Sequence, residues 1–138
     1  MQGFLLLLDL MEKITGIGGV FLKYTDVDKA KEWYKTYLGI DIGKYGYTYS
    51  WRKIEKPEEI AHTVFSLFKK EVSEAKPSTS AMINFRVSNL NALLSQLKKQ
   101  GIDQLGETEE YEYGKFAWIL DLEGNKIELW EPIDDKLV

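Results

Sequence analysis

Two stretches of the chain share one order of apolar and polar positions. They are "DVDKAKEWYKTYLGID", which starts at Asp26, and "NLNALLSQLKKQGID", which starts at Asn89. Each begins with a side chain that can cap a helix, repeats apolar residues every three or four positions, and stops at a glycine. The pattern predicts two amphipathic helices, each with one apolar face that must be covered.

The segments around these helices repeat as well, and they have the alternation of strands. The chain has a predicted strand before each helix, an aromatic alternation after it and a closing strand, at 19–25, 44–51 and 62–68 and again at 82–88, 112–118 and 125–130. We therefore predict an α+β fold of tandem βαβββ modules, which pack against each other or against another chain. The acidic run "GETEEYEYG" at 106–114 is predicted to be a solvated loop or an edge strand.

Composition narrows the class of protein. The chain has 138 residues, of which 44% are hydrophobic and 29% charged, and its formal net charge is −4 with scattered basic residues. These values predict one globular domain and argue against nucleic acid or a membrane as partner. The absence of cysteine excludes disulfides and thiolate zinc sites and fits a cytoplasmic location. The single histidine, His62, leaves little material for a histidine-rich metal site or a catalytic triad.

The ends of the chain are predicted to lie outside the domain. Residues 1–15 are an N-terminal extension, 16–132 one domain made of modules 16–70 and 80–132, and 133–138 a C-terminal tail. The apolar run Phe4 to Leu8 is too short to span a bilayer. It should be buried against the domain or against a second chain, and Met11 is an alternative start.

One acid stands out in the last predicted strand, "GNKIELWEP" at 124–132. Alternation places Ile127 and Leu129 on one face and Glu128 and Trp130 on the other. Two interpretations stay open at this point. The face of Glu128 is either solvated or lines a cavity where the carboxylate binds a metal, accepts a proton or holds a substrate.

The segments "GIGGVFLKYTDVDKAKEWYKTYLGI" and "YGKFAWILDLEGNKIELWEP" resemble the vicinal oxygen chelate superfamily, which includes glyoxalase I, bleomycin-resistance proteins and extradiol dioxygenases. The resemblance covers about Gly16 to Pro132. It implies paired βαβββ modules whose curved sheets enclose a cleft. In the metal-dependent members, four ligands lie in that cleft, one near each end of the repeated strands.

The resemblance assigns Glu128 to the last ligand position and Gly19, Ser66 and Met82 to the other three. Glycine offers no ligand, and a hydroxyl or a thioether is a weak one for these ions. We therefore expect no metal cofactor; the alternative is a divalent ion on Glu128. His62 lies roughly 13 Å along the strand from Ser66. It is predicted to sit at the sheet end, as a surface or loop-anchoring residue.

If Gly19 and Met82 point into the cleft, alternation predicts that other residues of the same strands do so too. A ligand would then contact Phe21, Lys23, Ser66, Met82, Asn84, Arg86, Trp118 and Trp130. Lys23 and Arg86 are repeat counterparts and would face each other, which favours an anionic or polar ligand between aromatic walls. The alternative is that both cations lie where the strands reach solvent.

Three functions follow from these residues. The first is a metal-independent protein that binds a small organic molecule, similar to the bleomycin-resistance proteins. A second is a lyase or isomerase of glyoxalase type in which Glu128 is the general base or a residual metal ligand. The third is a non-catalytic interaction domain whose cleft is filled by side chains. In all three we expect a homodimer.

Overall fold

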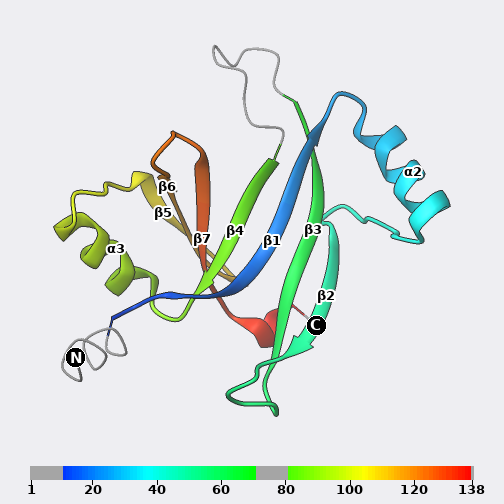
Figure 1. The fold of residues 1–138 in the computed structure, drawn as a ribbon. Helices are drawn as coiled ribbons and strands as arrows, with labels where there is room; N and C mark the ends of the chain where they lie inside the picture. Colours follow the sequence, from blue (N-terminus) through cyan, green and yellow to red (C-terminus); the bar gives the residue numbers. More distant parts are fainter. Residues whose placement is uncertain (1–10, 71–80, 138) are drawn as a thin grey trace.

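The computed structural model describes residues 11–70 and 81–137, so the apolar run Phe4 to Leu8 lies outside the described residues. Two helices and seven strands follow one another within these described residues (Figure 1). Their bounds are β1 Ile14–Tyr24, α2 Val27–Leu38, β2 Tyr47–Arg52, β3 Ile60–Lys69, β4 Ala81–Val87, α3 Leu90–Lys99, β5 Leu105–Tyr111, β6 Gly114–Leu120, β7 Lys126–Pro132 and the 3₁₀ turn η1 Asp134–Lys136.

All seven strands form one mixed sheet in the order β2-β3-β1-β4-β7-β6-β5. The first half contributes β1, β2 and β3, and the second half β4 to β7; β1 and β4 join the halves as an antiparallel pair. The α+β fold of two repeated modules is therefore confirmed. After its helix the first half has two strands and a single bridge between Gly43 and Gly46, whereas the second half has three strands. The acidic run forms β5, at one edge of the sheet.

The pairing of β1 with β4 shows an approximate twofold relation between the halves. Val20 pairs with Ile83, its own repeat counterpart, while Gly19 pairs with Asn84 and Phe21 with Met82. The relation continues outward, because Phe21 pairs with Ser66 on β3 just as Asn84 pairs with Glu128 on β7. The axis thus passes between β1 and β4, and equivalent strands of the two halves flank it.

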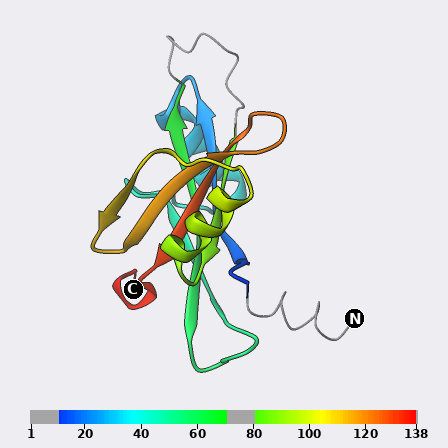
Figure 2. The ribbon, with the colours of Figure 1, turned by 90° about the vertical axis from the view of Figure 1, so that its left-hand side faces the viewer.

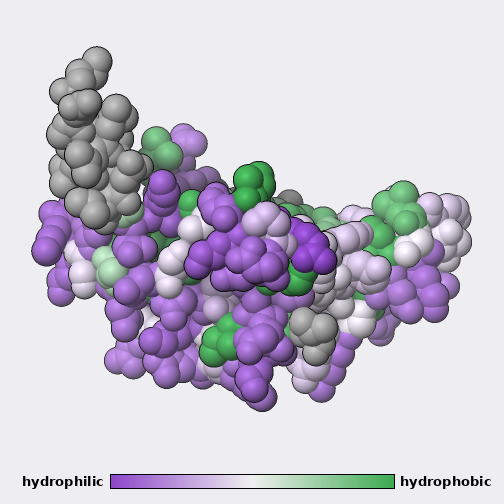
Figure 3. Space-filling model, turned by 90° about the horizontal axis from the view of Figure 1, so that it is seen from below, coloured by the Kyte–Doolittle hydropathy of each residue, from purple (hydrophilic) through white to green (hydrophobic). Residues whose placement is uncertain are grey.

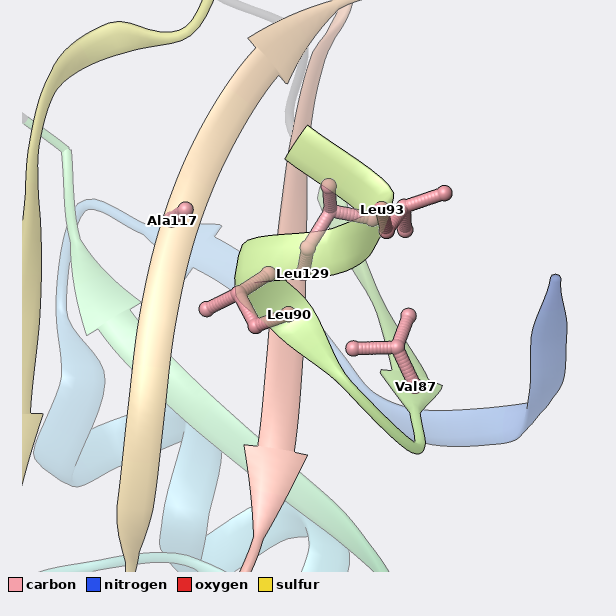
Figure 4. Packing of buried hydrophobic residues seen from close by; sticks show 5 residues of the cluster. All are labelled: Val87, Leu90, Leu93, Ala117 and Leu129. Carbon is pink, nitrogen blue, oxygen red and sulfur yellow. The ribbon is translucent and has the colours of Figure 1, made fainter. Parts of the chain in front are cut away.

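Helix α3 covers the outer face of the second half. The Asn89 side chain accepts a hydrogen bond of 3.0 Å from the backbone N–H of Ala92, which caps the helix. Leucines of α3 then pack on alternate residues of the sheet, and the buried cluster comprises Val87, Leu90, Leu93, Ala117 and Leu129 (Figure 4). Because these side chains point to the α3 side, those between them in β6 and β7 point to the opposite face.

Helix α2 is attached more loosely to the first half. Asp26 caps it through the N–H of Lys29 at 3.0 Å, and Gly39 ends it with a φ of 67°, but none of its residues is buried. Tyr34 makes the main packing contact, with its ring 5.3 Å from that of Phe65. Figures 1 and 2 show α2 beside the first half of the sheet and α3 beside the second.

The surface is mainly hydrophilic in the view from below, with hydrophobic residues in separate patches (Figure 3). None of the helices in the described part of the chain is long and apolar enough to cross a membrane.

Candidate functional site

A cavity of about 640 Å³ lies between the two halves, on the sheet face opposite α3. Strands of both halves contribute to its walls, and the segments around Lys44 and Leu137 form part of its rim. The lining residues are Gly18, Phe21, Lys44, Tyr45, Thr48, Val64, Ser66, Phe68, Asn84, Tyr113, Phe116, Trp130, Lys136 and Leu137. Four of the predicted site residues line this cavity: Phe21, Ser66, Asn84 and Trp130.

Aromatic rings form two walls of the cavity. In the second half, Phe116 and Trp130 lie nearly parallel, with 5.7 Å between ring centres and 9° between planes. Tyr113 packs edge-on against Phe116 at 5.7 Å, and its carbonyl accepts a hydrogen bond from the Trp130 indole. In the first half, Phe21 and Phe68 make an edge-to-face pair at 5.5 Å. The cavity can therefore hold apolar or aromatic groups.

Glu128 lies beside the cavity and is 8% exposed. Its Oε1 accepts a hydrogen bond of 2.6 Å from Asn84 Nδ2, and its Oε2 accepts one of 2.9 Å from the indole of Trp118. Burial raises the pKa of Glu128 above its ordinary value, although the hydrogen bonds from Asn84 and Trp118 act in the opposite direction. Asn84 lines the cavity, and Glu128 lies behind it.

Asn84 connects Glu128 with the cavity. Its side chain is 1% exposed, and its Oδ1 is buried without a hydrogen-bond partner. The orientation of the amide follows from Glu128, because an ionised carboxylate only accepts hydrogen bonds and so requires the Asn84 NH₂ group. The free carbonyl therefore lies over Gly18, where a Cβ would come within 2.0 Å of Oδ1. Only glycine fits at this position, because Oδ1 occupies the space that a Cβ would take.

The register shows which residues adjoin Glu128 and Ser66. Asn84 is the neighbour of Glu128 on β4, and Phe21 is the neighbour of Ser66 on β1. The resemblance placed the ligand positions of these two strands at Met82 and Gly19, which are two residues earlier in each case. Gly19 has no room for a side chain, since a Cβ would lie 2.8 Å from the carbonyl of Val64. Met82 pairs with Phe21 and does not belong to the lining.

The donor atoms around Glu128 do not fit a divalent metal of the kind that the superfamily's metal-dependent members hold. The strand neighbour of Glu128 supplies an amide, from Asn84, and the matching pair in the first half supplies a hydroxyl and a phenyl ring, from Ser66 and Phe21. Both oxygens of Glu128 already accept N–H hydrogen bonds. Within residues 11–70 and 81–137, no three His, Cys, Asp or Glu side chains are grouped so that they could hold a metal ion. One carboxylate and weak oxygen donors bind such an ion poorly.

Arg86 points to the cavity face but is already engaged by protein groups. It is 3% exposed and lies between two indoles, with its guanidinium 5.3 Å from the Trp51 ring and 5.4 Å from the Trp130 ring. Its Nη2 pairs with Asp134 at 2.5 Å, and its Nη1 donates to the carbonyl of His62 at 3.0 Å. Arg86 therefore packs between the two indoles beneath the cavity, and its charge is paired with Asp134 and is not exposed to the cavity.

The structure does not bring Lys23 to this cavity either. Lys23 lines a separate hollow beside α2, together with Trp33 and Lys70. It lies near the end of β1, two residues beyond Phe21, which does line the cavity. Lys23 and Arg86 thus do not face each other across the cavity. Among the described residues of the lining, the charged ones are Lys44 and Lys136, both exposed.

His62 anchors the C-terminal turn. It is 1% exposed; its Nε2 lies 3.1 Å from the carbonyl of Asp134, and its Nδ1 lies 3.0 Å from the Ser50 hydroxyl. A carbonyl only accepts, so Nε2 carries a proton and donates it to Asp134. The surface interpretation of His62 is wrong, whereas the anchoring one is confirmed.

Several lining residues were absent from the sequence prediction. Val64 and Phe68 alternate with Ser66, and Phe116 alternates with Trp118, so extending the same pattern would have found them. Gly18 gave no such signal, because β1 has a bulge between Ile17 and Gly19 that inserts one extra residue. Lys44, Tyr45 and Lys136 come from irregular segments, which periodicity does not describe.

The repeated halves, the shared mixed sheet and the cleft between them define an α+β protein of paired modules. The profile of the Glyoxalase/Bleomycin resistance protein/Dioxygenase superfamily matches residues 16–129, and the chain belongs to this superfamily. The family prediction made from the sequence is therefore confirmed.

Individual relatives agree with this assignment. An uncharacterized protein of Bacillus subtilis (strain 168), YetH, is 28% identical over 115 residues, which are 81% of this chain and 94% of the relative. Methylmalonyl-CoA epimerase from Mycobacterium tuberculosis has a similar structure, with a TM-score of 0.58 and 21% identity, covering 90% and 92% of the two chains. A Streptomyces coelicolor methylmalonyl-CoA epimerase variant in complex with 2-nitronate-propionyl-CoA reaches 0.67 at 15% identity, covering 88% and 99%. At these identities the two epimerases establish the fold alone.

Proposed function

We propose that this protein binds a small organic molecule in the cleft between its two halves, without a resident metal ion. The observation that carries the proposal is the cavity of about 640 Å³, because it lies between the two halves, is lined by aromatic residues of both, and has the size of a ligand site. Aromatic rings from both halves form its walls, which suit apolar or aromatic groups. The open cavity also argues against an interaction domain whose cleft is filled by side chains.

A binding screen with one blocking variant tests this proposal. Thr48 is exposed on the edge strand β2 and lines the cavity, so Thr48→Trp should fill the cavity without disturbing the core. Tyr49 is its neighbour on the other face of β2 and is absent from the lining, which makes Tyr49→Trp the matched control. Ligand-observed NMR with a library of small organic compounds should find binders that Thr48→Trp loses and Tyr49→Trp keeps.

Two results would contradict the proposal. The first is a broad library in which no compound binds in a manner sensitive to Thr48→Trp. The second is purified protein that contains Ni, Zn, Fe or Mn in a 1:1 ratio by elemental analysis and loses ligand binding when that metal is removed.

A second candidate function is an isomerase or lyase in which Glu128 takes a proton from the substrate. The favouring observation is the position of Glu128, which burial gives a raised pKa directly behind the cavity. A carboxyl of this kind suits proton abstraction next to a carbonyl at neutral pH. Glu128→Gln should then abolish turnover of any accepted substrate while binding persists. Unchanged turnover in this variant would rule the candidate out.

A further inference from the structure

We propose that the apolar run Phe4 to Leu8 packs on the outer face of the sheet, over Ile14 and Ile17 of its own chain. This face lies on the α3 side, opposite the cavity, so the proposal is independent of what the cleft binds. The run lies outside the described residues, whereas the surface that it would cover and the point from which it leaves the domain lie within them.

The surface to be covered continues the hydrophobic core of the second half. Ile14 pairs with Val87, which is buried in the cluster under α3, and Ile17 pairs with Phe85, which packs against that cluster. Residues directly opposite each other in an antiparallel pair have their side chains on the same face of the sheet. The two isoleucines therefore extend this core onto β1, but they are 42% and 44% exposed there.

Gln96 of α3 fixes the point from which the N-terminal segment leaves the domain. Its Oε1 accepts a hydrogen bond of 3.2 Å from the backbone N–H of Glu12, and its Nε2 donates one of 3.1 Å to the carbonyl of the same residue. Both ends of one side-chain amide thus hold a single backbone position at the side of α3, where β1 starts (Figures 1 and 2). Residues 1–10 therefore leave the domain beside the exposed isoleucines.

The length of the connection favours the same chain over a second copy. Leu8 is four residues from Glu12, a distance of at most ~14 Å. Ile14 and Ile17 are two and five residues from Glu12 on the other side, roughly 7 and 17 Å along β1. A chain that reverses its direction at 9–11 can therefore lay the run over both. A short tether of this kind gives a local concentration in the millimolar range, which a second copy does not match in dilute solution.

Another exposed apolar surface lies too far away for the run of the same chain. Trp33 and Tyr37 on α2 are 51% and 70% exposed. However, α2 follows the far end of β1, roughly 33 Å from Ile14 along the strand (Figure 1). A run that is joined to Glu12 by four residues cannot cover that surface. Five consecutive apolar residues gain free energy when they leave water, and the isoleucines of β1 are the apolar surface within their reach.

A nitroxide label next to the run tests the contact. The chain has no cysteine, so Gln2→Cys creates a single site for the label. In isotopically labelled protein that carries the nitroxide, the amide signals of Ile14 and Ile17 should lose intensity in NMR spectra. The matched control adds Leu6→Asp and Leu7→Asp, which keep the length of the tether but place two charges in the run. Most of the signal loss should disappear in this control, because burying unpaired charges is unfavourable.

A mixed sample separates the chain's own surface from that of a second copy. Isotopically labelled protein without the nitroxide is mixed with unlabelled protein that carries it. Full signal loss at Ile14 and Ile17 in this mixture would place the run on a second copy and overturn the proposal. Loss of equal size with and without Leu6→Asp and Leu7→Asp would also overturn it, because the tether alone would then explain the proximity. So would the absence of any loss.

Urea unfolding gives a second and independent readout. Ile17→Ser should raise the unfolding equilibrium constant about tenfold in the unmodified chain, where the run covers this side chain, and about twofold in the chain with Leu6→Asp and Leu7→Asp. Ile133→Ser is the matched control, since Ile133 is 43% exposed and lies before the C-terminal turn; its effect should be the same in both chains. Equal effects of Ile17→Ser in the two chains would contradict the contact. Should Ile17→Ser fail to fold, the nitroxide measurements still decide.

Discussion

At the scale of single residues, the site contains a buried carboxyl, that of Glu128, whose two oxygens both accept hydrogen bonds from neutral N–H groups. Asn84 and Trp118 each donate one hydrogen bond to Glu128, and no cation is paired with it in the described residues. A buried carboxylate held only by neutral donors keeps part of its desolvation penalty. Glu128 therefore costs stability when ionised, which is a common property of residues retained for binding or catalysis.

The pH dependence of stability should report this penalty. Burial raises the pKa of Glu128 above the ordinary glutamate value of about 4.3. A group with a higher pKa in the folded state stabilises the protein below its unfolded-state pKa, and this contribution is lost as pH rises through the folded-state pKa. Urea unfolding from pH 4 to pH 8 should show the free energy of unfolding of the wild type falling relative to Glu128→Gln, then levelling. A difference that grows in favour of the wild type would show that hydrogen bonds to the carboxylate outweigh its desolvation.

Two glycines of β1 give a matched test of the space beside Asn84. In Gly18→Ala, the new Cβ would lie 2.0 Å from Asn84 Oδ1 and 2.9 Å from the Trp130 ring, so the site must shift. We expect a loss of about 1–3 kcal/mol in the free energy of unfolding, as for other overpacked positions. In Gly16→Ala the nearest atom, on Trp51, is 3.3 Å away, and the loss should be smaller. Equal losses in urea unfolding would contradict the close approach at Gly18.

Some residues of the site could be predicted from the sequence and others could not. Alternation within a regular strand was enough to place Phe21, Asn84 and Trp130 on the cavity face. It failed for Lys23, because alternation gives the face of a residue but not how far along β1 the cavity extends. It also could not show that Arg86 pairs with Asp134, which is 48 residues away and belongs to a segment predicted as a tail.

At the scale of elements, the C-terminal turn joins the two halves around the cavity. η1 follows β7 of the second half and is held by the first half, since the carbonyl of Asp134 lies 3.1 Å from His62 Nε2 on β3. Asp134 also pairs with Arg86 on β4. The next residues, Lys136 and Leu137, line the cavity, so this anchor fixes part of the rim. Most bounds of the helices and strands were predicted to within a few residues, because their apolar patterns and caps are local, but β1 begins at Ile14 and not at the predicted residue 19. The anchor at η1 is a tertiary contact, which such local patterns do not contain.

Removal of the Asp134 carboxylate should release that anchor. In Asp134→Ala, Arg86 keeps its charge at 3% exposure but loses its acid, and an unpaired buried charge is strongly unfavourable. We expect a loss of about 3 kcal/mol in the free energy of unfolding, at the low end for buried pairs because Asp134 is in partial contact with water. Asp135→Ala is the matched control, since Asp135 is its exposed neighbour in the same turn. A loss of similar size in both variants would assign the effect to the turn itself.

At the scale of the whole molecule, the halves differ in how they are stabilised. The buried hydrophobic cluster of the second half lies under α3, whereas no residue of α2 is buried. The first half is instead continuous with the second through β1 and β4, and through contacts of Arg86 and Asp134 with β3. The repeat in the sequence predicted two similar halves, but it could not show this unequal burial, because the two helices have comparable patterns. The homodimer stays a prediction.

This arrangement predicts that the two halves unfold together. Opening the first half alone would expose the edge of β4 and break the pairing of β1 from Ile14 to Leu22, while leaving Arg86 without its contact to His62. The thin core around α2 cannot sustain the first half after such a separation. Hydrogen exchange read by mass spectrometry in rising urea should therefore give one common free energy of opening for β1, β3, β4 and β7. Amides of α2 should exchange through a smaller local opening. If β3 opened at a lower urea concentration than β7, the pairing of β1 with β4 would not couple the unfolding of the two halves. The cavity would then be lost whenever the first half unfolds, even while the second half stays folded.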